Sequence, residues 1–123
     1  MMHDHSYVLR WLSAFLFTVA LEVPIVAWLT RPTQKNLGRR VALAVCAQCA
    51  SHPAVWFIFP TLGLKYWNMI MLAECWAVLS ETLIYFGLNE KLSLRRALLI
   101  SLCANGLSYG LGFASQRFWG WPG

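Results

Sequence analysis

Charged residues are scarce in this sequence, and acidic residues are the scarcest of all. Of the 123 residues, 12% are charged, 59% are hydrophobic and only five are Asp or Glu. So few charges among so many hydrophobic residues exclude a disordered chain and are not typical of a soluble domain. The length is enough for one compact unit and too short for two with separate cores. We therefore expect residues 1–123 to form a single transmembrane domain.

The sequence also has neither a disulfide framework nor a recognisable catalytic motif. Its four cysteines, Cys46, Cys49, Cys75 and Cys103, all lie inside apolar runs. A free cysteine in such a place behaves as a small hydrophobic residue. Cys46 and Cys49 have the Cys-x-x-Cys spacing of redox and soft-metal sites, but reactivity requires an accessible thiolate, and both lie inside a predicted membrane span. The cysteines thus give little support to a thiol function.

Four apolar runs are long enough, as helices, to cross the roughly 30 Å hydrocarbon core of a bilayer. They cover residues 11–30, 41–62, 69–88 and 97–118. The predicted fold class is an all-α membrane protein with four transmembrane helices in an antiparallel bundle. Pro24 in the first run and Pro53 in the second are expected to kink those two helices.

The basic residues predict the orientation of the chain. The loops at 31–40 and 89–96 contain seven Lys and Arg, whereas the opposite side has only Arg10, Lys65 and Arg117. Because cytoplasmic loops are enriched in Lys and Arg, both basic loops are predicted to be cytoplasmic and both termini outside, in the inner (plasma) membrane of the cell. The orientation of the chain thus explains its net charge of +5. The expected partner is the lipid bilayer, and nucleic-acid binding has no support.

Three of the five acids, Glu22, Glu74 and Glu81, lie inside apolar runs. An acid at membrane depth costs about 2.5–3.5 kcal/mol and usually faces the interior of the bundle, where it finds a partner. Glu74 and Glu81 are seven residues apart, which is close to two helical turns, so they share one helix face. We therefore expect the other helices to direct their polar residues toward this third run.

Polar residues of all four runs fall near one depth. From the rise per residue, Glu22, His52, Glu81 and Asn105 come near the bilayer centre, and Glu74 about 10 Å further out. Asn105 belongs to a face of small and polar residues that also includes Ser108 and predicts close helix packing. The candidate residues for binding an ion, a proton or a substrate are Glu22, His52, Glu74, Glu81, Asn105 and Ser108.

Three functions are compatible with such a site. The first is proton- or cation-linked movement of an ion or small solute, which four short helices would achieve as a homo-oligomer or in a larger membrane complex. The second is an accessory or assembly subunit, whose polar residues only fix helix pairing. The third is a metal-dependent intramembrane enzyme with His52, Glu22 and Glu81 as ligands. We predict the first; the sequence leaves enzymatic activity open and indicates no cofactor.

Overall fold

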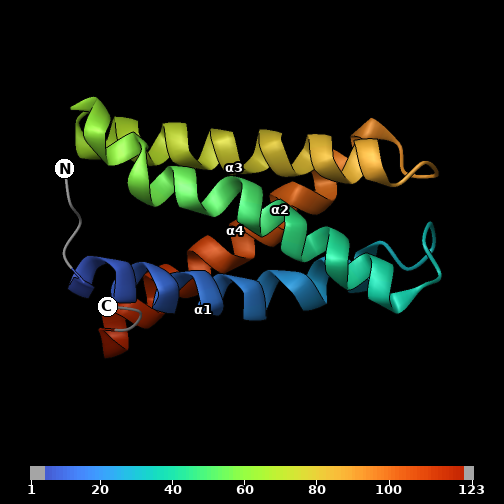
Figure 1. Ribbon diagram of the computed structural model, residues 1–123, viewed down its shortest axis with the longest axis horizontal. Coiled ribbons are helices and arrows are strands. Elements are labelled where there is room, and N and C mark those ends of the chain that lie inside the picture. Colours follow the sequence, from blue (N-terminus) through green and yellow to red (C-terminus); the bar gives the residue numbers. More distant parts are fainter. Residues whose placement is uncertain (1–4, 121–123) are drawn as a thin grey trace.

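The computed structural model describes residues 5–120, and four long helices make up most of this part of the chain (Figure 1). They are α1 (His5–Leu29), α2 (Leu37–Phe57), α3 (Tyr66–Leu88) and α4 (Leu94–Trp119), with a short 3-10 helix, η1 (Phe59–Leu62), after α2. Four segments, counting α2 and η1 as one, are long and apolar enough to cross a membrane. The prediction of an all-α four-helix bundle is confirmed, and these segments indicate a small multi-pass membrane protein.

All four helices begin before the apolar runs that predicted them. α1 begins at His5 rather than at residue 11, α2 at Leu37 rather than at 41, α3 at Tyr66 rather than at 69, and α4 at Leu94 rather than at 97. Side-chain caps set two of these starts, because Asn36 accepts a hydrogen bond from the Arg39 amide (3.1 Å) and Ser93 accepts one from the Arg96 amide (3.2 Å). Polar and basic residues thus continue the helices beyond the apolar segments.

The second predicted span does not form one continuous α-helix. α2 ends at Phe57, and η1 follows with Pro60 inside it. Proline has no amide hydrogen and disfavours the α conformation of the preceding residue, so the α-helix cannot simply continue through this segment. Gly63, with a φ of 68°, ends η1 in the left-handed region that glycine adopts without strain. Pro24 and Pro53 lie inside α1 and α2, and the kinks expected there stay a prediction.

Each long helix packs against two others. The contacting pairs are α1 with α2, α2 with α3, α3 with α4, and α4 with α1. The four helices therefore enclose a common interior. In Figure 1 the turn containing η1 lies at one end of the bundle, and the connections 30–36 and 89–93 lie at the other. We call these the η1 end and the basic end.

Small residues fill the interior, and large apolar residues cover the outside. The buried alanines are Ala14, Ala27, Ala44, Ala47, Ala73, Ala77, Ala97 and Ala104. By contrast, Leu9 is 64% exposed, Met71 67% and Phe118 75%. Small residues let membrane helices approach closely, while lipid is a good solvent for exposed leucine and phenylalanine side chains. This distribution is the one expected of helices surrounded by lipid.

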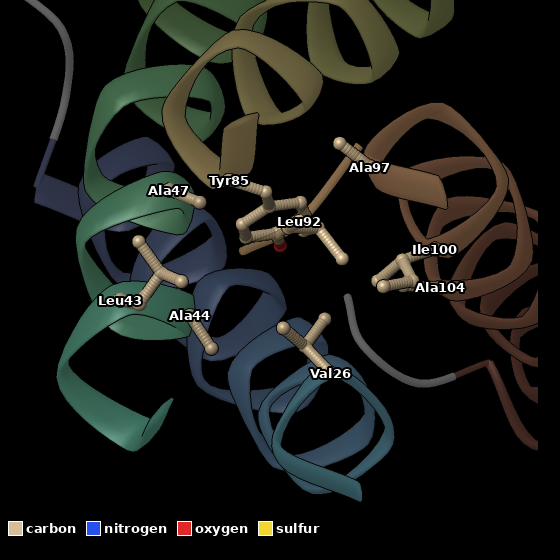
Figure 2. Close-up of a cluster of buried hydrophobic side chains, with 9 residues drawn as sticks. All are labelled: Val26, Leu43, Ala44, Ala47, Tyr85, Leu92, Ala97, Ile100 and Ala104. Atoms are coloured by element: carbon tan, nitrogen blue, oxygen red, sulfur yellow. The ribbon is translucent and has the colours of Figure 1, made fainter. Parts of the chain in front are cut away.

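Between the middle of the bundle and its basic end, the interior is apolar. Figure 2 shows this cluster, which we call the basic-end core, with the Tyr85 ring in its middle. Its members are Val26, Leu43, Ala44, Ala47, Tyr85, Leu92, Ala97, Ile100 and Ala104. All of them are buried, so the bundle is closed on this side by hydrocarbon.

Candidate functional site

Directly next to the basic-end core, hydrogen bonds join polar side chains of all four long helices. The two carboxyl groups of this set, Glu22 on α1 and Glu81 on α3, are both fully buried. The other members are uncharged amides and hydroxyls, and we call the whole set the carboxyl network. It consists of Glu22, Gln48, Ser51, Glu81, Ser101, Asn105 and Ser108.

Gln48 on α2 bridges the two carboxyl groups. Its Nε2 donates to Glu22 Oε2 and to Glu81 Oε1, the latter at 3.0 Å. A glutamine amide has two N–H donors, so a single side chain can serve one acid with each. Gln48 is only 1% exposed and lies on a helix that packs against both α1 and α3. It therefore joins two acids of helices that do not contact each other directly.

Serine and asparagine side chains supply the other donors to the two acids. Ser51 Oγ donates to Glu81 Oε1 at 2.9 Å, and Asn105 Nδ2 donates to Glu81 Oε2. On the other side, Ser108 Oγ donates to Glu22 Oε1 at 2.9 Å. Since Asn105 and Ser108 are both on α4, the bonds form a closed circuit through α1, α2, α3 and α4. Uncharged donors thus satisfy both buried acids.

No cationic side chain belongs to the carboxyl network. Within residues 5–120, the donors to Glu22 and Glu81 are amides and hydroxyls. Two buried carboxyl groups that share one hydrogen-bond donor have up to two negative charges to neutralise. A proton or a small cation can supply the missing positive charge. The site is therefore chemically suited to exchange one of these for another.

A pocket of about 460 Å³ extends from the carboxyl network toward the η1 end. Glu81, Asn105 and Ser108 line its inner part, and Tyr66 and Gln116 line its outer part. Both outer residues are exposed, so the pocket reaches the surface of the bundle. Glu22 does not line the pocket and lies behind Gln48 and Ser108. One acid thus faces the pocket while the other is enclosed.

The structure brings together four of the six candidate residues. Glu22, Glu81, Asn105 and Ser108 all belong to the carboxyl network. Glu74 is half-buried two turns from Glu81 and lines the pocket, and it accepts no hydrogen bond from the described residues. It faces the same cavity as Glu81 without being bonded to the network.

His52 lies in the pocket wall and outside the carboxyl network. Its Nδ1 accepts a hydrogen bond from Trp11 Nε1 at 3.2 Å, and its ring lies 5.4 Å from that of Phe15. The hydrogen-bond partner of His52 is thus an indole and not an acid. The metal-ligand set of His52, Glu22 and Glu81 is not assembled either, because no group of three possible ligands comes together among residues 5–120.

Sequence reasoning missed Gln48 as a member of the site, together with Ser51 and Ser101. All three lie in apolar runs, and Gln48 and Ser51 are three residues apart, which puts both on one helix face. That spacing was the available signal. The four cysteines, in contrast, are free and exposed on the outside of the bundle, so none of them belongs to the site.

Comparisons of the chain with protein-family models, with curated proteins and with solved structures gave no match. The function therefore has to be inferred from the geometry of the carboxyl network and its pocket.

Proposed function

We propose that this protein moves an ion or a small solute across a membrane, with the movement linked to protons or cations at Glu22 and Glu81. In this proposal the bundle is antiparallel, is kinked at Pro24 and Pro53, and lies in the inner membrane of the cell. The basic loops are cytoplasmic and the termini outside, so the pocket opens outward. A homo-oligomer or a larger membrane complex would surround it.

The observation that supports this function is the pair of fully buried carboxyl groups, of which Glu81 lines the pocket and Glu22 lies behind it. Ionisable groups at membrane depth are costly and commonly mark ion or substrate paths. Here both acids are held in place by hydrogen bonds from the two helices α2 and α4, and none of these donors is charged. A purely structural network could use amides alone, without the cost of burying two acids.

The basic-end core favours a carrier over an open pore. The pocket leads from the η1 end to Glu81, while beyond it the interior is filled by alanine, valine, leucine and isoleucine side chains and by the Tyr85 ring. An ion bound at Glu81 could move further only after these side chains separate. Secondary transporters work in this way, with a site near the midplane that is open to one side at a time.

The test is flux into proteoliposomes under a pH gradient and under an imposed potential. Glu81→Gln keeps the shape of the side chain and removes its charge, and we expect it to reduce proton or cation flux at least tenfold. Glu90→Gln makes the same chemical change at an exposed residue outside the pocket and should leave the flux unchanged. Circular dichroism of both variants would check that the helices remain folded.

Two results would contradict the proposal. One is the absence of flux in the wild-type protein for protons, alkali metals and divalent metals alike. The other is a Glu81→Gln variant that transports as fast as the wild type.

A second candidate is an accessory subunit. Gly106 and Gly110 of α4 are exposed on the outside of the bundle, and a β-carbon added at either position would meet no atom of another described helix within 4 Å. Such a pair of small residues can bring a neighbouring helix close. For this function the carboxyl network would only hold the bundle together, so Glu81→Gln would be tolerated while Asn105→Leu would disrupt assembly.

A further inference from the structure

The pocket has a composition that the carboxyl network does not explain. Glu74 and Glu81, which both line it, are two turns apart on α3, a spacing of about 10 Å. Its walls also include the aromatic residues Tyr7, Trp56 and Phe113. Within the described residues, no lysine or arginine lines it. The pocket therefore combines negative charge with aromatic faces.

The volume of the pocket is larger than a bare inorganic cation needs. A cavity of about 460 Å³ is of the size that binds small organic molecules, and a bare inorganic cation would fill only a small part of it. Two acids without a cationic partner would repel an anion, and a neutral molecule would leave them without compensation. An occupant with both a positive charge and an apolar body satisfies the acids and the aromatic walls together.

The rings of Tyr7, Trp56 and His52 form a connected wall on one side of the pocket. The Tyr7 and Trp56 rings are 5.5 Å apart, and the His52 ring stacks at 6.4 Å from Trp56. Tyr7 Oη also donates to the Trp56 carbonyl oxygen, which fixes α1 against α2 at this point. A rigid aromatic surface attracts a quaternary ammonium group through the negative face of its rings. The wall is thus built in advance of any ligand.

We propose that the pocket binds an organic cation with an apolar body, whose positive group lies between Glu74 and Glu81 and whose body lies against Tyr7, Trp56 and Phe113. This inference rests on the proposed function, since it names the class of substrate for the same site. Glu74 then has a role that the carboxyl network does not give it. Its carboxyl group, free of hydrogen bonds from the described residues, is available to the ligand.

The test is equilibrium dialysis of labelled benzyltrimethylammonium against the protein in nanodiscs, with empty nanodiscs subtracted. We expect saturable binding at one site per chain. Neopentylbenzene, which has the same shape without the charge, should not compete, and neither should sodium at equal concentration. Glu74→Gln should weaken binding at least tenfold, and Glu90→Gln, which is outside the pocket, should bind as the wild type does.

Several results would overturn this assignment. They are the absence of saturable binding, unchanged binding by Glu74→Gln with normal circular dichroism, and equal competition by neopentylbenzene or by sodium.

The failure of this inference can be distinguished from the failure of the proposed transport function. Probe binding without flux in proteoliposomes would support this inference and contradict the transport function. Glu81-dependent cation flux without probe binding would support the transport function and contradict this inference.

Discussion

Replacing Gln48 with leucine is expected to destabilise the bundle by about 1–3 kcal/mol and to stop ion movement. The change removes both hydrogen bonds that the amide donates, one to Glu22 and one to Glu81. Hydrogen bonds between membrane helices contribute about 0.6–2 kcal/mol each, and two are lost. The acids also lose the group that lies between them, so their charges have to be accommodated without a shared donor.

The measurement is unfolding in mixed micelles, followed by helical circular dichroism, together with flux in proteoliposomes. Cys49→Leu is the matched control, because it introduces the same side chain at the next position of α2, where the residue is exposed on the outside. We expect this control to unfold and to transport as the wild type does. A Gln48→Leu variant as stable and as active as the control would show that the bridge between the acids has no role.

The fold was predictable because it depends on quantities that are local in the sequence. The length of each apolar run fixes whether a helix can cross a bilayer, whatever the other helices do. The ends were harder, since α2 and α4 start at caps provided by Asn36 and Ser93, outside the apolar runs. The end of α2 was also hard to predict, because the apolar run continues through Pro60, although a proline there prevents the α-helix from continuing.

The site was only partly predictable, because the depth of a residue in the membrane and the direction of its side chain have different origins. Depth follows from the rise per residue, which predicts one level for Glu22, Glu81 and Asn105, and the carboxyl network joins these three residues. Direction depends on how each helix is rotated against its neighbours, which the sequence of one helix does not determine. His52 lies one turn beyond Gln48 and turns to Trp11, whereas Gln48 turns to the acids.

An ionisable side chain inside an apolar run predicts a functional site, and His52 is a candidate for this reason, whereas Gln48 is a neutral amide. Two buried acids, however, need donors, and an amide supplies two without bringing a charge into the membrane. A glutamine in an apolar run that contains no acid is therefore an informative signal when the neighbouring runs contain acids.

Tyr85 provides the second prediction with a large effect, because its hydroxyl has no hydrogen-bond partner among residues 5–120 although the side chain is fully buried. It is one turn beyond Glu81 on α3, and the other members of the basic-end core are hydrocarbon. An unsatisfied buried hydroxyl costs about 1–3 kcal/mol. Tyr85→Phe removes that cost and keeps the ring, so we expect it to stabilise the bundle by a similar amount.

Tyr7→Phe makes the same chemical change with the opposite expected sign, since the Tyr7 hydroxyl donates to the Trp56 carbonyl oxygen. Unfolding of both variants in mixed micelles would compare the two hydroxyls directly. A Tyr85→Phe variant less stable than the wild type would show that the hydroxyl has a partner, such as a bound water molecule.

Flux then tests why a costly hydroxyl lies in the basic-end core. In the proposed mechanism this core has to separate, and Tyr85 would offer an ion or proton leaving Glu81 a polar atom one turn further along α3. We therefore expect Tyr85→Phe to be more stable than the wild type and to transport at least tenfold more slowly. Greater stability with unchanged flux would mean that ions pass the core without using this hydroxyl. The opposed effects on stability and transport are what distinguish a functional group from a packing residue, because a packing residue would lose both together.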